Sequence, residues 1–130
     1  MKYLQVFSHI ITCLVEGEFM QMEDVYRIDQ GIERYMTKTQ KKTADFMEGC
    51  MELGGLLGDW QEDEIIELKK YGHALGMAFQ ITDDIMDYRE TAETTGKPVG
   101  NDLREGLLTY PLLSIVNDGK KINCLKRLKA

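Results

Sequence analysis

Apolar residues recur at helical spacing through most of the chain. Between Tyr3 and Met20 they fall on one wide face, which predicts a first helix. After a short lapse, a second apolar pattern runs from about Asp29 to Leu57, and its middle, TKTQKKT, is polar. A polar stretch within an otherwise amphipathic helix indicates that this part faces solvent or charged groups.

The segment GGLLGDW separates the second pattern from a third. Its glycines, crowded into a few residues, make a poor helix interior, so a turn is predicted here. The third helix is predicted from about Asp63 to Tyr88, which gives it a length of about 39 Å.

The loop that follows, ETAETTGKPVGNDLREG, is long and rich in glycine. Its glycines and proline predict that it holds no regular structure, and loops of this length are often functional. A fourth helix is predicted through Leu112 to Val116, ending near Asn117 and followed by a basic tail. Since no stretch shows the alternation typical of a strand, we expect an all-α helical bundle of four main helices.

Composition narrows this expectation to one globular unit. The 130 residues are 43% hydrophobic and 29% charged and contain no linker-like stretch, which predicts a single all-α domain over residues 1–130. The formal net charge of −6 argues against nucleic-acid binding, because phosphate contacts need a basic face. An anionic substrate would need metal ions between itself and the carboxylates.

Three cysteines, Cys13, Cys50 and Cys124, lie far apart without CxxC spacing, so neither a disulfide framework nor a zinc site is indicated. No segment approaches the roughly 20 apolar residues of a membrane span. The N-terminal segment is interrupted by polar residues, and we interpret it as a helix of the fold and not as a signal peptide. These features favour a cytoplasmic protein with reduced thiols.

The segment FQITDDIMDY places several acids in the third helix. Asp83 and Asp87 are four residues apart and stack on one face of the helix, where Gln80 joins them. Asp84 lies about 100° round the helix from Asp83. Like charges at this spacing repel each other, whereas a divalent cation between them would reverse the sign. Oxygen-only ligands favour Mg²⁺, which completes its shell with waters and phosphate oxygens.

An acidic stripe of this kind can also be a solvated helix face with no ligand. Here, however, apolar residues flank the acids: Phe79, Ile81, Ile85 and Met86. They predict a helix buried on most of its circumference, with the acids turned into a cavity. In the second helix, Tyr35 and Met36 stand at helical spacing and are predicted to pack in the core.

Three segments occur in a fixed order: FQITDDIMDY, then GKPVGNDLREG, then TYPLL. They resemble the second aspartate-rich motif and the following loop of the trans-polyprenyl diphosphate synthases, which include the heptaprenyl diphosphate synthases. Upstream, the segment beginning at Glu16, with Gln21, and the segment beginning at Lys42 are similar to that family's GE..Q and KTA elements. The resemblance covers about residues 2 to 116 and implies an isoprenoid-synthase-like bundle, of which this chain is the central and C-terminal part.

The resemblance implies three metal ligands. Asp83, Asp84 and Asp87 would hold the Mg²⁺ that binds the diphosphate of an allylic substrate. The implied reaction is Mg²⁺-dependent ionisation of the allylic diphosphate, attack by the double bond of isopentenyl diphosphate, and loss of a proton. Metal ions and lysines suit this reaction, because they neutralise the departing diphosphate.

The resemblance also implies catalytic and substrate-binding residues. Lys42 would contact the allylic diphosphate, and Thr43 and Gln80 would line the place where positive charge develops. Lys97, in the loop, would reach the leaving diphosphate, and Asp102 would lie beside it.

Two departures from the family pattern limit the expectation to half of an active site. The family's first aspartate-rich motif is absent from this sequence, and a short basic tail stands where the family continues through further helices beyond Val116. In the loop, Leu107 also stands where many relatives have a lysine. The resemblance implies a dimer, and helices meant to be covered on both sides would expose apolar surface. We therefore expect a homo-oligomer or pairing with another prenyl synthase subunit.

Three other interpretations stay open. The chain can be a noncatalytic or regulatory subunit that needs a catalytic partner, or an inactive fragment. A class I terpene cyclase is the third, although the segment from Asn101 to Glu105 lacks the spaced metal motif of those enzymes. The product chain length cannot be predicted, because the resemblance places its main determinants near the missing first motif.

Overall fold

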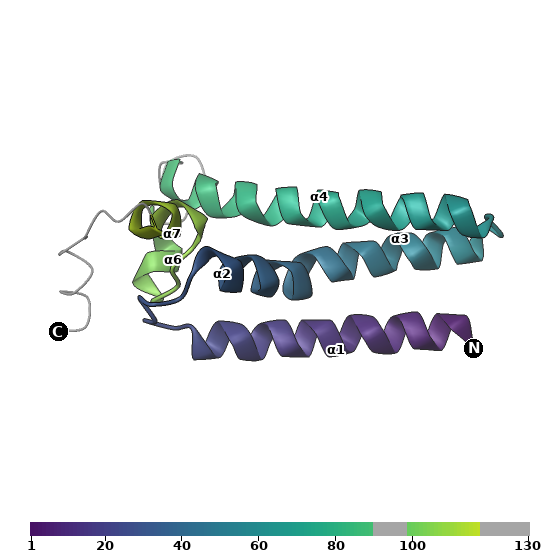
Figure 1. Ribbon diagram of the computed structural model, residues 1–130, viewed down its shortest axis with the longest axis horizontal. Helices are drawn as coiled ribbons and strands as arrows, with labels where there is room; N and C mark the ends of the chain where they lie inside the picture. The colour runs from purple at the N-terminus through teal and green to yellow at the C-terminus, as the bar shows by residue number, and fades with distance from the viewer. Residues whose placement is uncertain (90–98, 118–130) are drawn as a thin grey trace.

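The structure, a computed structural model, describes residues 1–89 and 99–117, which form an all-α fold as predicted (Figure 1). The helices of the described residues are α1 (Lys2–Glu23), α2 (Ile32–Thr39), η1 (Gln40–Ala44), α3 (Asp45–Leu57), α4 (Glu62–Arg89), α6 (Asn101–Arg104) and α7 (Tyr110–Asn117). The basic tail expected after Asn117 lies outside the described residues.

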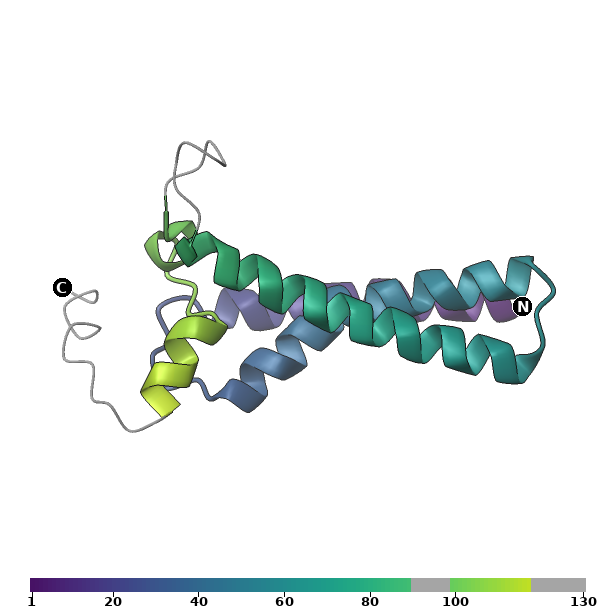
Figure 2. The same cartoon turned by 90° about the horizontal axis from the view of Figure 1, so that it is seen from above.

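Three long helical rods lie side by side: α1, the run α2–η1–α3, and α4 (Figure 1). The short helices α6 and α7 gather at one end of the rods, where α1 and α4 finish and α2 begins. Figure 2 shows that α4 crosses over the α2–η1–α3 run, with α1 behind both. The end covered by α6 and α7 is therefore where residues far apart in the sequence meet.

Two glycines permit the close approach of the rods at η1. A Cβ atom on Gly76 of α4 would lie 2.6 Å from the Cα of Ala44, and one on Gly17 of α1 would lie 2.9 Å from the backbone nitrogen of Lys42. Ala44 and Lys42 both belong to η1. The η1 backbone is thus held between α1 and α4 at positions where any larger side chain would force a shift.

The second predicted helix is confirmed as a continuous helical run from Ile32 to Leu57. Its polar middle contains a feature that the apolar pattern did not predict, the π-helical turn η1. Such turns are rare, and they frequently occur at functional sites, because the extra residue in the turn changes which side chains share a face.

The turn predicted to begin at Gly54 was misplaced. The helix α3 continues to Leu57, and the chain reverses after it, where Asp59 has a φ of +53°. Gly55 stays helical because it packs against α4: a Cβ atom there would lie 2.8 Å from the side chain of Ile65. This glycine serves a close contact between helices and not a turn.

The prediction that the loop after α4 holds no regular structure was also wrong in part. Residues Asn101–Arg104 form the helical turn α6. Gly100 and Gly106 flank it with φ values of +70° and +80°, so the glycines allow the chain to enter and leave the turn. Residues 90–98 of this loop lie outside the described part.

Much apolar surface is exposed in this chain. Along α1 the exposed side chains form one stripe: Leu4, Phe7, Ile11, Val15, Phe19 and Met22. On α4, Phe79 is 57% and Met86 is 42% exposed, so the prediction that this helix is buried on most of its circumference was wrong. None of the described helices combines the length and apolar character that a membrane crossing requires.

Candidate functional site

A cavity of about 220 Å³ opens at the end of the rods where α2, η1 and α4 meet the segment around α6. Its walls are mostly polar or charged, in contrast to the apolar stripe on α1. The predicted site residues that line it are Lys42, Thr43, Gln80, Asp83, Asp84 and Asp102. Residues from three separate parts of the sequence are thereby brought to one place.

Asp87, unlike the other described site residues, does not line this cavity. The carboxylate of Asp87 accepts hydrogen bonds from the backbone nitrogens of Asn101 and Asp102, both at 3.2 Å. Asp87 therefore holds the first turn of α6 against α4, and this contact brings Asp102 to the cavity. Lys97 lies outside the described residues.

Asp84 is a buried carboxylate, with 5% of its surface exposed. The hydroxyl of Tyr35 donates to one of its oxygens at 2.5 Å, and the amide nitrogen of Gln80 donates to the other at 2.9 Å. Burial raises the pKa of Asp84, and the two hydrogen bonds oppose that rise by stabilising the anion. Both oxygens are already engaged, so Asp84 is held firmly in place.

The hydrogen bonds continue from Asp84 to η1. The hydroxyl of Thr43 donates to the amide oxygen of Gln80 at 2.9 Å, while the nitrogen of the same amide donates to Asp84. Since the hydroxyl hydrogen of Thr43 is used in this bond, its oxygen offers lone pairs to other groups. A threonine oriented in this way suits a neighbouring positive charge.

Lys42 is held by the α1 segment that resembles the GE..Q element. Its ammonium group donates to the side-chain oxygen of Gln21 at 3.0 Å and pairs with Glu18 at 2.8 Å. The neighbouring Lys41 pairs with Glu16 of the same segment. These contacts fix the Lys42 ammonium at the rim of the cavity, where about a third of the side chain stays exposed.

Carboxylates converge on the cavity from α4 and α6. Burial, together with the nearby charges of Asp87, Asp84 and Asp83, raises the pKa of Asp102 to about 6. In the described part of the chain, the carboxylates of Asp83 and Asp102 make no hydrogen bond. This oxygen-only set fits Mg²⁺ or Ca²⁺. Among the described residues, Asp84 and Asp87 already accept hydrogen bonds, whereas Asp83 and Asp102 accept none.

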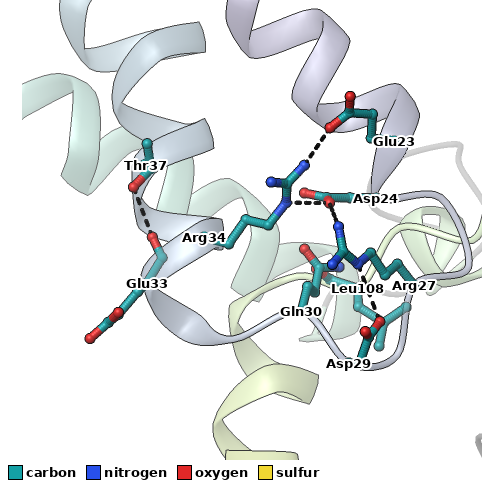
Figure 3. Close-up of polar contacts among 9 residues, drawn as sticks. All are labelled: Glu23, Asp24, Arg27, Asp29, Gln30, Glu33, Arg34, Thr37 and Leu108. Atoms are coloured by element: carbon teal, nitrogen blue, oxygen red, sulfur yellow. Dashed lines mark hydrogen bonds and ion pairs between the residues drawn. The ribbon is translucent and has the colours of Figure 1, made fainter.

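The connection between α1 and α2 is anchored by a fully buried carboxylate (Figure 3). Asp24 accepts a 2.6 Å hydrogen bond from Arg34, and Arg27 approaches the same oxygen at 4.0 Å. Arg34 also bonds to Glu23 at 2.8 Å. Two arginines thus compensate one buried negative charge, which would be costly without them.

This connection in turn supports the cavity wall. The backbone nitrogen of Tyr26 donates to the carbonyl of Gly106 at 2.8 Å, and the side-chain amide of Gln30 donates to the carbonyl of Leu108 at 3.5 Å. Leu107 and Thr109, which alternate with these residues, line the cavity. The Asp24 anchor therefore positions one wall of the site from outside it.

Several residues that line the cavity were missed at the level of sequence: Tyr35, Lys38, Thr39, Glu105 and Thr109. Tyr35 was predicted to pack in the core; it is buried as predicted, and it also bonds to Asp84. A signal for two of the others was present, because Lys38 and Thr39 precede Lys42 and Thr43 by four residues and so fall near the same helix face.

A second group of possible metal ligands lies elsewhere, between α3 and α4. The ring nitrogen Nδ1 of His73 lies 3.2 Å from Glu48 and 3.9 Å from Asp45. Lys69 also approaches Glu48, at 3.6 Å, so ion pairs explain this cluster without a metal. His73 and Asp83 are separated by ten residues of one helix, about 15 Å, so the cluster is distinct from the cavity.

The arrangement matches known proteins in sequence and in fold. The chain matches the polyprenyl synthetase family over residues 1–129. It is 40% identical over 114 residues to heptaprenyl diphosphate synthase component 2 of Geobacillus stearothermophilus, an alignment that covers 88% of this chain and 36% of that protein. This chain therefore belongs to the polyprenyl synthetase family, as its motifs predicted.

Solved structures agree with this assignment. Heptaprenyl diphosphate synthase from Staphylococcus aureus superimposes with a TM-score of 0.87 at 33% identity, covering 98% of this chain and 39% of that one. Polyprenyl synthase from Caulobacter crescentus CB15, complexed with calcium and isoprenyl diphosphate, superimposes with a TM-score of 0.86 at 31% identity. The match covers 95% of this chain and 38% of that one. The chain thus spans less than two fifths of the length of these relatives.

Proposed function

We propose that this chain supplies the part of a polyprenyl diphosphate synthase that binds and ionises an allylic diphosphate. The observation that carries the proposal is the cavity whose lining combines carboxylates of α4 and α6 with a lysine of η1. An acidic wall cannot hold a diphosphate directly, because like charges repel, but divalent cations between the two reverse the sign. The Caulobacter crescentus relative, complexed with calcium and isoprenyl diphosphate, supports this interpretation.

Each predicted residue has a role in this proposal. Mg²⁺ bound by the aspartates would neutralise the departing diphosphate; Asp83 and Asp102 accept no hydrogen bond among the described residues and are the proposed direct ligands. Lys42 binds a phosphate oxygen of this diphosphate. The sequence predicts the same role for Lys97. Thr43 presents its oxygen, oriented by Gln80, toward the allylic carbon on which positive charge develops. The second substrate is isopentenyl diphosphate, whose double bond attacks the cation before a proton leaves.

The chain is proposed to act within an assembly. It spans less than two fifths of its relatives, and one of them is named component 2 of a heptaprenyl diphosphate synthase. The exposed stripe on α1 supplies an apolar face for a second copy or for another prenyl synthase subunit. A noncatalytic or regulatory subunit, or an inactive fragment that needs a partner chain, stays the alternative. The cytoplasmic location expected from the cysteine spacing stays a prediction.

Isothermal titration of the purified chain with a nonhydrolysable allylic diphosphate analogue, with and without Mg²⁺, tests the proposal. We expect binding that requires Mg²⁺ and that weakens at least about tenfold in the Asp83→Asn variant, because one charged ligand is lost. Asp63→Asn, an exposed acid at the other end of α4, is the matched control and should bind as the wild type does. Binding that is absent, or that ignores Mg²⁺ and Asp83, contradicts the proposal.

A further inference from the structure

Lys38 is a buried lysine that the proposed roles leave unused. It lies on α2, four residues before Lys42, and both lysines line the same cavity. Lys38 has 6% of its surface exposed, and its ammonium nitrogen lies 5.7 Å from the centre of the Tyr35 ring. Among residues 1–89 and 99–117, this nitrogen makes neither a hydrogen bond nor an ion pair.

The nearest acids do not serve as partners for this lysine. Burial lowers the pKa of Lys38, and the charges of Asp24 and Asp84 oppose that shift from a distance. Asp24 is bonded to Arg34 through one oxygen, its other oxygen has no partner in the described part of the chain, and Asp84 is bonded to Tyr35. Neither acid forms an ion pair with Lys38 among the described residues. A buried ammonium group is costly to the fold where it has no dedicated acceptor, so its presence at a cavity points to an acceptor that arrives with a ligand.

Thr109 also lines the cavity, but its buried hydroxyl lies near that of Tyr88, a contact that opposes the rise that burial gives to the pKa of Tyr88. Lys38 offers its donors to this enclosed space. A ligand that satisfies a buried ammonium group must carry acceptor oxygens, as a diphosphate does.

We propose that Lys38 is a second lysine for the diphosphate in this cavity and acts beside Lys42. This inference rests on the proposed function and extends it with a residue that would contact the substrate. Lys42, at the rim, keeps its bonds to α1, whereas Lys38 is more deeply buried and donates to no residue in the described part of the chain. A tetrahedral phosphate accepts hydrogen bonds from several directions, so both lysines can bind one group at once.

The test is the affinity for inorganic diphosphate with Mg²⁺, measured by isothermal titration for the wild type, Lys38→Met and Lys38→Arg. Lys38→Met should bind about tenfold or more weakly, because a charge-assisted hydrogen bond is lost. Lys38→Arg, which keeps the charge, should bind within a few fold of the wild type. Lys70→Met is the matched control, since Lys70 is exposed on α4 and pairs with Glu67, away from the cavity.

Thermal unfolding without ligand separates a binding role from a structural one. If Lys38 serves the ligand, Lys38→Met unfolds at the same temperature as the wild type or higher, because a costly buried charge has gone. Unchanged affinity, or a loss of affinity in a variant that unfolds at a lower temperature, would overturn the inference. If the wild type binds and Asp83→Asn does not, while Lys38→Met binds normally, only the role of Lys38 fails. If the wild type itself does not bind, the proposed function fails with it.

Discussion

The hydroxyl of Tyr35 donates a 2.5 Å hydrogen bond to the carboxylate of Asp84, and both side chains are buried. The two residues are 49 positions apart in the sequence, and their contact joins α2 to α4 beside the cavity. Burial raises the pKa of Tyr35, so its hydroxyl stays protonated and remains a donor at neutral pH. One residue of the aspartate-rich motif is thus built into the fold.

Tyr35→Phe should therefore destabilise the chain. The substitution leaves one oxygen of a buried carboxylate without its donor, at an expected cost of about 1–3 kcal/mol in the free energy of unfolding. Urea denaturation followed by circular dichroism measures this. Tyr110→Phe is the matched control, because the Tyr110 ring lies 6.0 Å from that of Tyr35. In the described part of the chain, the hydroxyl of Tyr110 makes no hydrogen bond. Equal stabilities for Tyr35→Phe and the wild type would contradict the structural role of this contact.

Two glycine substitutions should change stability in opposite directions. Gly76→Ala places a Cβ atom 2.6 Å from the backbone of Ala44 and should cost about 1–3 kcal/mol by forcing α4 away from η1. Gly54→Ala meets nothing within 4 Å and should stabilise α3 by about 0.5–1 kcal/mol, because alanine is the better helix former. Thermal unfolding of both variants gives the comparison. Destabilisation by Gly54→Ala, or tolerance of Gly76→Ala, would count against the packing described at η1.

The convergence of carboxylates should make the stability of the metal-free chain depend on pH. The pKa of Asp102 is raised to about 6 from an unfolded value of about 3.9. The folded state therefore holds the proton of the Asp102 carboxyl more tightly than the unfolded state does. The stability that protonated Asp102 contributes is full below about pH 4 and is lost as the pH rises through about 6.

Asp102→Asn removes this titration. Relative to the wild type, the variant should gain about 1 kcal/mol at pH 7, after allowance for solvent screening, and gain nothing at pH 4. Unfolding measured from pH 4 to pH 7 in the presence of a chelator tests the sign. A variant that is less stable than the wild type at pH 7 would show that Asp102 is stabilised by its surroundings and not strained by them.

Self-association should follow from the apolar stripe on α1. The chain is expected to elute as a dimer or a larger species at micromolar concentration, because the stripe would otherwise face water. The double substitution Phe7→Gln and Phe19→Gln should shift the molar mass of the species toward that of the monomer. Light scattering coupled to size-exclusion chromatography measures this mass. Ser8→Gln, also exposed on α1 but polar from the start, is the control. A wild type that is monomeric under these conditions would rule the stripe out as an interface.

The sequence predicted the helices better than the site they form. Apolar spacing located α1, α4 and α7, because the helical period gathers apolar residues on one side of a helix, even where that side is exposed in this chain. The same spacing could not show η1, since polarity in TKTQKKT reports exposure and carries no information about hydrogen-bond register. The turn was misplaced at Gly54 and Gly55 because a glycine can mark either a turn or a close contact between helices. The sequence around the glycine does not show whether another helix packs against it.

The residue types predicted which side chains lie at the site but not what each side chain does there. Asp83, Asp84 and Asp87 are alike in the sequence, yet Asp84 is buried against Tyr35 and Asp87 holds α6, whereas Asp83 accepts no hydrogen bond from any described residue. These differences arise from elements that approach from elsewhere in the chain. Lys38 was missed because a lysine on a polar helix segment is usually solvated, and its burial arises where α2 packs against α1 and α7.

Crystals of the chain grown with Mn²⁺ and inorganic diphosphate would test the central claim most directly, through the anomalous signal of the metal. The claim predicts a peak at coordination distance from Asp83 and from phosphate oxygens, with the diphosphate in contact with Lys42. A peak confined to Asp45, Glu48 and His73, or no ordered metal in the cavity while diphosphate is bound elsewhere, would contradict it.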